Sequence, residues 1–364
     1  MRESFFSIGH IPAVLYGEEA DQVFLFVHGK CGYKEEAEAF AEIVCPRGWQ
    51  VLAADLPEHG SRKGEKDSFD PWHVVPELKS LLAYARARWS RVALRANSIG
   101  AWFSMLAFQE EPLEQCLFVS PVLNMPGLIG RMMQWAGVTE EELEARETIE
   151  TSFGETLSWR YFQYAQSHPV QTWPHPTAIL YAGRDELTPR QEAEDFAGQF
   201  RCDLAVMEEG EHWFHTPAQL AELDRWTRTN TAPALSPEEL LFFAGAPEEL
   251  ALYEGFRCRL LETVGEVGIR VSKTQITCSG RYGFAFVSHP RRKKDRGILV
   301  SFGLSHRQES PRIQAASEPY PNRWTHHVLV QSPEEIDQEL MDWVQEAFWF
   351  ANAKKRGKHI GPKW

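Results

Sequence analysis

Short apolar runs alternate with amphipathic helical stretches through the first two thirds of the chain. Several runs are apolar on consecutive residues, which is typical of strands buried on both faces of a sheet. Strand and helix in series predict an α/β fold with a mostly parallel sheet and right-handed crossovers. We expect eight strands, the first two forming a hairpin, at 3–9, 12–18, 23–29, 49–57, 91–98, 115–121, 177–185 and 202–210.

One long interval, about 122–176, interrupts this alternation and contains helical patterns at 127–138, 139–150 and 155–166. Long insertions at strand ends often carry function, so the interval is either a helical cap over a site or an ordinary helical excursion. Its large apolar residues either line an acyl pocket or pack against the body of the domain: Met132, Met133, Trp135, Trp159, Tyr161, Phe162 and Tyr164.

The pattern changes after residue 230, where a segment poor in apolar residues predicts a linker at 231–236. Strands then follow one another without helices between them, which favours a smaller α+β domain at 237–364 after the α/β domain at 1–230. Two S-P-E-E sequences, at Ser236 and Ser332, are capping boxes that predict helix starts. The expected strands are 269–279, 282–290, 297–304 and 323–330, before a closing helix at 332–354.

Charge and composition narrow the classes of function. The net charge of −13 argues against nucleic-acid or anionic-membrane binding by the whole chain. The basic segment 289–297 is either a solvated hairpin tip or a contact for an acidic partner or nucleic acid. We find no apolar run long enough to span a membrane and no signal peptide. Six scattered cysteines are typical of reduced thiols, so we expect a cytoplasmic protein.

Ser98 stands where a buried strand ends and a helical pattern begins. In so sharp a turn the backbones of the neighbouring strand and helix come close to the side chains two residues before and after Ser98. Only small residues such as Ala96 and Gly100 fit at these two positions. The serine hydroxyl would then stand clear at the carboxyl end of the sheet, beside a helix N-terminus that favours developing negative charge. A nucleophile and an ordinary capping serine are the two interpretations.

A nucleophilic serine needs a base, and the base needs an acid that orients it. Asp185 follows one predicted strand and His212 follows the next, so both are expected at the same sheet edge as Ser98. His215 is an alternative base, three residues further on.

Stabilising the oxyanion of an acyl-transfer reaction requires two backbone N–H groups aimed at one point. Ile99 follows the candidate nucleophile and supplies one. Lys30, in the loop after the strand at 23–29, is our choice for the other, through its N–H and not its side chain. His28 is expected to be structural, and Cys31 to be inert.

These motifs resemble those of the α/β-hydrolase superfamily, in its esterase and lipase-like branch, over residues 1–230. The chain order Ser98, Asp185, His212 is that of the family. Ala96 and Glu58 stand where glycine is usual. The resemblance implies an eight-stranded sheet with a variable helical cap, a Ser-His-Asp mechanism and no cofactor. It rests on the segments FVHGKCG, DLPEHGSR, ANSIG, YAGRDELTP and GEHWF.

The last part of the chain resembles the uncharacterised DUF5655 domain, which implies a fold unit and almost no chemistry. The resemblance rests on RVSKTQITCSGRYGFAFVS, ILVSFGL, SPRIQAASEPYPNRWTHHVLV and SPEEIDQELMDWVQEAF.

We therefore expect a serine hydrolase acting on a small-molecule carboxylic ester or thioester, with neither a cofactor nor a metal ion. The alternatives are a non-catalytic scaffold on the same fold, or a peptidase or lyase. A protein partner or self-association would use the C-terminal domain.

Overall fold

We analysed a computed structural model of the chain, which describes residues 1–231, 235–265, 267–290, 292 and 295–353. The chain divides into two compact units, Met1–Thr231 and Ala232–Trp364. Half of the expected linker, residues 232–234, lies outside the described residues, as do 291, 293 and 294 of the basic segment and the end of the second domain, 354–364.

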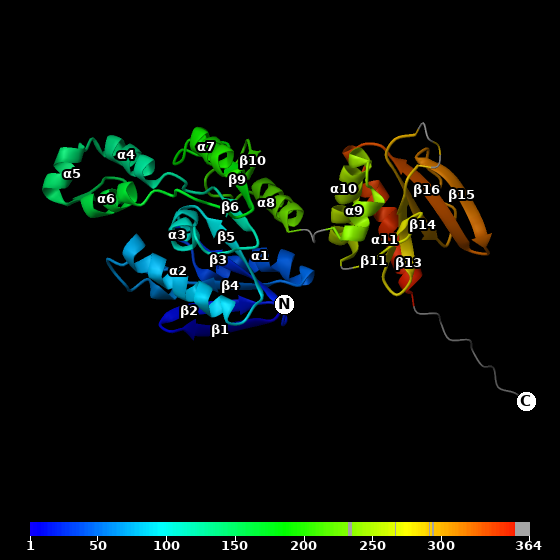
Figure 1. Cartoon of the computed structure of the whole chain (residues 1–364), viewed down its shortest axis with the longest axis horizontal. Helices are drawn as coiled ribbons and strands as arrows, with labels where there is room; N and C mark the ends of the chain where they lie inside the picture. The colour runs from blue at the N-terminus through cyan, green and yellow to red at the C-terminus, as the bar shows by residue number, and fades with distance from the viewer. Residues whose placement is uncertain (232–234, 266, 291, 293–294, 354–364) are drawn as a thin grey trace, which may run out of the picture. The chain divides into compact units, whose positions relative to one another are not determined.

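The first unit is built on an eight-stranded sheet in the order β1-β2-β4-β3-β5-β6-β9-β10 (Figure 1). β1 and β2 form an antiparallel hairpin, β2 pairs antiparallel with β4, and the remaining pairs are parallel. The predicted fold class and strand count are therefore confirmed. The strands are β1 (Glu3–Ile8), β2 (Ile11–Tyr16), β3 (Gln22–Val27), β4 (Gln50–Ala54), β5 (Arg91–Asn97), β6 (Cys116–Val119), β9 (Thr177–Ala182) and β10 (Asp203–Met207).

Helices cover both faces of this sheet, as continuous apolar strands require. α2 (Pro71–Arg86) and α3 (Ile99–Phe108) pack on one face, and α1 (Ala37–Val44) and α8 (Pro217–Asn230) pack on the other. α2 begins where Asp70 accepts a hydrogen bond from the His73 N–H and Pro71 takes the first helical position. α7 (Arg190–Phe200) joins β9 to β10, and short 3-10 turns occur at Lys34–Glu36, Cys45–Arg47 and Gly60–Arg62.

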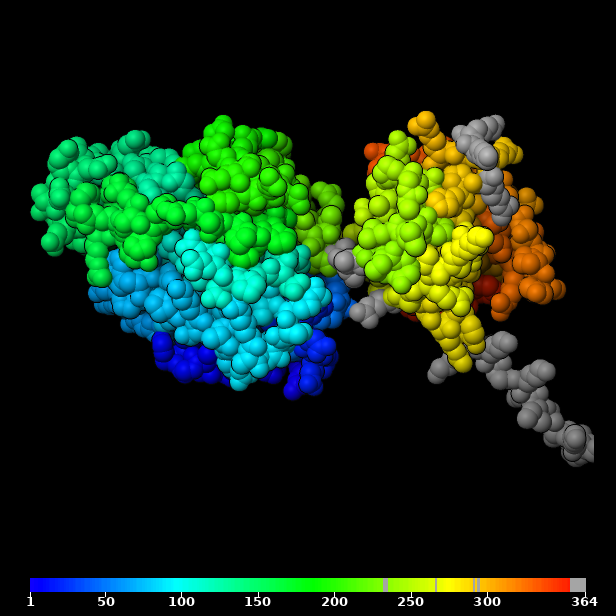
Figure 2. Space-filling model, in the orientation of Figure 1, coloured from blue at the N-terminus to red at the C-terminus, as the bar shows by residue number. Residues whose placement is uncertain are grey.

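The long interval between β6 and β9 forms α4 (Met125–Ala136), α5 (Glu140–Arg146) and α6 (Trp159–Ser167). It also contains a hairpin of β7 (Thr148–Glu150) and β8 (Thr156–Ser158), where the helical patterns predicted no strand. In the space-filling view the green surface of this segment, which we call the cap, is continuous with the blue surface of α2 (Figure 2). Trp72 of α2 contacts Tyr161 and Tyr164 of α6.

The second unit pairs a six-stranded antiparallel sheet with helices on one face. The strand order is β11-β12-β13-β14-β16-β15, and α10 (Pro247–Val264) and α11 (Gln338–Asn352) contact β14. β15 (Ile313–Tyr320) is an outer strand, with register irregularities near Ala315 and Pro319. The other elements are α9 (Pro237–Phe242), β11 (Gly268–Val271), β12 (Ile276–Ser279), β13 (Gly283–Ser288), β14 (Ile298–Leu304) and β16 (Arg323–Val330).

The two capping boxes have different outcomes. Ser236 and Glu239 form the predicted reciprocal box at the start of α9. The prediction that Ser332 starts the closing helix was wrong, because Pro333–Glu335 is only a 3-10 turn. Glu335 instead accepts from the Gln331 N–H, and Asp337 caps α11. Among the described residues, no helix is long and apolar enough to cross a membrane.

Candidate active site

Ser98 occupies a strained turn between β5 and α3. Its φ of 48° and ψ of −124° lie outside the regions that most side chains adopt. Gly100 must be glycine, since a Cβ there would lie 2.4 Å from the His28 carbonyl oxygen and 2.9 Å from that of Val27. Ala96 is fully buried beneath the turn. The close approach of the end of β3 to α3 therefore explains why residue 100 is a glycine.

Three side chains form a continuous hydrogen-bonded chain at the carboxyl end of the sheet. Ser98 Oγ lies 2.8 Å from His212 Nε2, and His212 Nδ1 lies 2.6 Å from Asp185 Oδ2. The Asp185 side chain is fully buried, whereas that of His212 is 20% exposed. The imidazole is thus in contact with both partners and still open to a substrate.

Asp185 is held in its ionised form by its surroundings. Burial alone would raise its pKa, but hydrogen bonds from His212, from the Thr188 hydroxyl and from backbone N–H groups outweigh burial and lower it. Thr188 donates from its hydroxyl at 2.8 Å, and the N–H groups of Leu187 and Thr188 donate to Oδ1. The role of Thr188 was not foreseen, although aspartate often accepts from the backbone N–H two residues on, as Asp185 does from Leu187.

The loop after β3 lies against the nucleophile. A Cβ on Gly29 would come within 3.1 Å of Ser98 Cβ. His28 is buried; its Nδ1–H donates to the Gly29 oxygen and its Nε2 accepts the Leu56 N–H. Burial lowers the pKa of His28 to about 4, so the ring stays neutral. Lys30 follows in this loop, and Ile99 begins α3, where its N–H has no partner within the helix.

His215, the alternative base, and His59, in the loop after β4, make other contacts. His215 Nδ1 is 2.9 Å from the Trp213 oxygen and 3.5 Å from Glu211, and the ring stacks on Trp213. His59 stacks on Phe69, and its Nδ1 lies 2.8 Å from the Pro57 oxygen. Only His212 among them touches Ser98.

Glu58 shows why a glycine is usual at its position. Its φ is +65°, in the left-handed region that glycine adopts most readily. The carboxylate compensates locally, because its Oε1 accepts hydrogen bonds from the N–H groups of Ser68 and Phe69.

The apolar cap residues mostly pack against the body of the unit. Tyr161 stacks on Trp102 of α3 with ring centroids 5.7 Å apart, and its hydroxyl is buried without a hydrogen bond in the part of the chain described. Trp135 is an exception, being 49% exposed and in edge contact with Phe153. Met133 and Phe162 are buried in the core, and Met132, Trp159 and Tyr164 are partly buried against it.

Polar contacts anchor the cap to both walls of the site. On one side Arg131 of α4 pairs with Glu192 at 2.7 Å and donates to the Leu187 carbonyl oxygen in the loop of Asp185. On the other side the Lys30 ammonium pairs with the carboxylate of Glu155, in the turn between β7 and β8. These contacts span 56 to 125 residues of sequence, and no local pattern predicted them.

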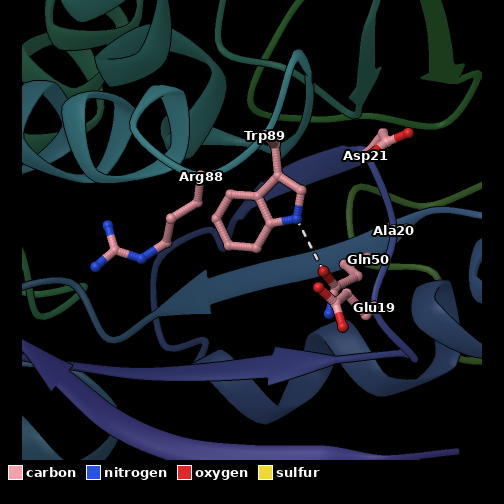
Figure 3. A pocket seen from close by; sticks show the side chains of 6 residues that line it. All are labelled: Glu19, Ala20, Asp21, Gln50, Arg88 and Trp89. Atoms are coloured by element: carbon pink, nitrogen blue, oxygen red, sulfur yellow. Dashed lines mark hydrogen bonds between the residues drawn. The ribbon is translucent and has the colours of Figure 1, made fainter.

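Other features offer no competing centre. Within the described residues, no three His, Cys, Asp or Glu side chains gather to hold a metal ion. A recess of about 590 Å³ is lined by residues before β3 and β5 and at the start of β4, so it lies at the amino end of the sheet, away from Ser98 (Figure 3). Inside it the Trp89 Nε1–H donates to Gln50 at 2.8 Å.

The first unit thus has the α/β-hydrolase fold, and comparisons with solved structures agree. It is similar to Est1E from Butyrivibrio proteoclasticus with ferulic acid bound, at 18% identity and a TM-score of 0.52 over 63% of this chain and 98% of that one. A putative hydrolase from Agrobacterium vitis S4 is similar at 14% sequence identity and a TM-score of 0.52, over 62% of this chain and 97% of that one. Mouse alpha/beta hydrolase domain-containing protein 10 is similar at 16% sequence identity and a TM-score of 0.50, over 62% of this chain and 96% of that one.

The second unit carries a known sequence family. Residues 241–351 match the model of a domain of unknown function, DUF5655, as the sequence motifs indicated. A comparison with curated protein sequences found no match.

Proposed function

We propose that the first unit is a serine hydrolase that cleaves carboxylic esters or thioesters, with Ser98, His212 and Asp185 as its catalytic triad. The observation that carries this proposal is the unbroken contact from Ser98 through His212 to Asp185, at 2.8 and 2.6 Å, on a strained serine. A capping serine would need none of these features.

In this mechanism Ser98 Oγ attacks the carbonyl carbon of the substrate while its proton passes to His212 Nε2. The N–H groups of Lys30 and Ile99 stabilise the oxyanion. The bond from the acyl carbon to the leaving oxygen or sulfur then breaks, and His212 returns the proton to the leaving group. Water attacks the acyl-enzyme by the same route and releases the acid. Asp185, kept ionised, orients the imidazole and stabilises its protonated form.

Labelling with a fluorophosphonate probe tests the triad. We expect wild type to be labelled, Ser98→Ala to be unlabelled, and His212→Ala to react at least about a hundredfold more slowly, because the base is lost. His215→Ala is the matched control and should react like wild type. Short and long p-nitrophenyl esters and the corresponding thioesters would then define the leaving group and acyl length.

Two results would contradict the proposal. Equal labelling of wild type and Ser98→Ala would place the reactive group elsewhere. A folded wild type that neither reacts with the probe nor hydrolyses any of these substrates would favour the non-catalytic scaffold.

A further inference from the structure

The loop that carries Lys30 is a short turn, closed where the Gly32 N–H donates to the Gly29 oxygen at 3.2 Å. His28 and Gly29 are held by the buried imidazole, which bridges the Gly29 oxygen and the Leu56 N–H. Over the described part of the chain, neither Lys30 nor Cys31 makes a backbone hydrogen bond. Cys31 also has a φ of +63°, an uncommon conformation for a residue other than glycine. Lys30 and Cys31 are thus held by the single hydrogen bond that spans them, and their own backbone groups add no further contact.

The contact that holds the tip comes from the cap. The Lys30 ammonium pairs with Glu155, and this is the one hydrogen bond or ion pair that Lys30 and Cys31 make among the described residues. Glu155 lies 125 positions later in the chain. The Lys30 side chain is therefore tied to the cap from the loop that lies against the nucleophile.

Glu155 is itself held firmly. The Thr151 N–H and hydroxyl donate to the Glu155 carbonyl oxygen at 2.8 and 2.7 Å, and the Glu155 N–H donates back to that hydroxyl at 3.1 Å. Ile149 and Leu157, on the paired strands β7 and β8, are buried in the core. The backbone that carries the Glu155 side chain is therefore fixed, and its carboxylate gives the Lys30 turn a second point of attachment.

We propose that Glu155 is a positioning residue, which holds Lys30 so that its backbone N–H points into the oxyanion hole. This inference rests on the proposed serine hydrolase function. The two side chains are 46% and 34% exposed, so their pairing contributes little to global stability. The effect is therefore on the geometry of the loop, and the cap becomes part of the catalytic machinery.

Steady-state hydrolysis of p-nitrophenyl acetate by the full chain tests the proposal. We expect Glu155→Gln and Lys30→Met each to lower kcat about tenfold. This loss is smaller than that from deleting an oxyanion-hole donor, because Lys30→Met keeps its backbone N–H. KM should change less than about twofold, because the contact acts on the transition state. The double variant should lose no more than either single variant, and the charge swap Lys30→Glu with Glu155→Lys should recover most of the rate.

Salt and a control variant separate positioning from a general defect. Raising NaCl to about 1 M should lower the wild-type kcat toward that of Glu155→Gln and leave the variant unchanged, since exposed pairs are screened. Glu150→Gln, on the same hairpin and exposed, should match wild type throughout. Thermal unfolding should be unchanged in every variant.

Two outcomes would overturn the inference, and they differ from failure of the proposed function. Equal kcat for wild type and Glu155→Gln, with wild type labelled by fluorophosphonate, would refute positioning and leave the triad standing. A rise in KM alone would assign Glu155 to substrate binding. Absence of probe labelling in the folded wild type would refute the function and this inference together.

Discussion

Arg95 is a buried charge without a counter-ion in the part of the chain described. It lies on β5, is 3% exposed, and its Nε and Nη1 atoms make no hydrogen bond. Its guanidinium carbon is 5.7 Å from the ring centres of both Phe40 and Trp226. Burial lowers the pKa of Arg95 to about 9. Arg62 is similarly buried but forms ion pairs with Glu65 and Glu77.

We predict that Arg95→Met raises the free energy of unfolding by roughly 1–2 kcal/mol. An apolar side chain of similar volume removes the cost of desolvating a charge and loses only weak contacts with the rings. Urea denaturation would measure the change. The matched variant Arg62→Met should lower stability by about 3 kcal/mol, since it leaves two carboxylates without their partner. A lower urea midpoint for Arg95→Met would contradict the prediction.

At the scale of elements, the packing of α3 against β3 determines the geometry of the nucleophile. We predict that Gly100→Ala abolishes fluorophosphonate labelling and lowers the free energy of unfolding by about 1–3 kcal/mol, through overpacking against rigid backbone. The new methyl would lie 2.4 Å from the His28 oxygen, so α3 must move away from β3 and take Ser98 with it.

Gly130→Ala, in α4, is the control for this substitution. A Cβ there meets no atom within 4 Å, so we expect unchanged labelling and a gain of about 0.5–1 kcal/mol from helix propensity. Wild-type labelling by Gly100→Ala would show that the turn tolerates a side chain at this position.

The elements near Ser98 were predictable because each has a local signal. Buried strands are apolar on consecutive residues, and the small residues Ala96 and Gly100 mark the sharp turn. The β7–β8 hairpin was missed because its strands have three residues each and are flanked by sequences with helical periodicity. The start of α11 was misplaced because Ser332 and Asp337 are both good caps, and only the fold decides between them.

The ion pairs that attach the cap to the rest of the unit had no sequence signal. The pairing of Lys30 with Glu155 and that of Arg131 with Glu192 depend on how the cap lies over the sheet. Charged residues are frequent throughout this chain, so their partners follow from the tertiary structure alone.

For the whole molecule, the separation into two units has a direct consequence for activity. Every residue of the proposed site lies in Met1–Thr231, and the core of the second unit is a separate cluster. We predict that a fragment of residues 1–231 folds and reacts with fluorophosphonate within about twofold of the full-length rate, because a domain with its own core can fold alone.

The second unit, produced as residues 235–364, is the control and should fold without reacting. Circular dichroism would establish the folding of both fragments. A folded first fragment that reacts more than tenfold slower than the full chain would contradict the prediction and assign the second unit a part in the reaction.

The outer strand β15 bears on how copies of this chain can associate. A free strand edge offers unpaired N–H and C=O groups to another chain and so invites aggregation. Pro319 has no N–H to offer, and the register irregularities near it and near Ala315 bend the strand away from a straight template. This edge is therefore protected against polymerisation, and we expect self-association of the second unit not to continue the sheet from β15.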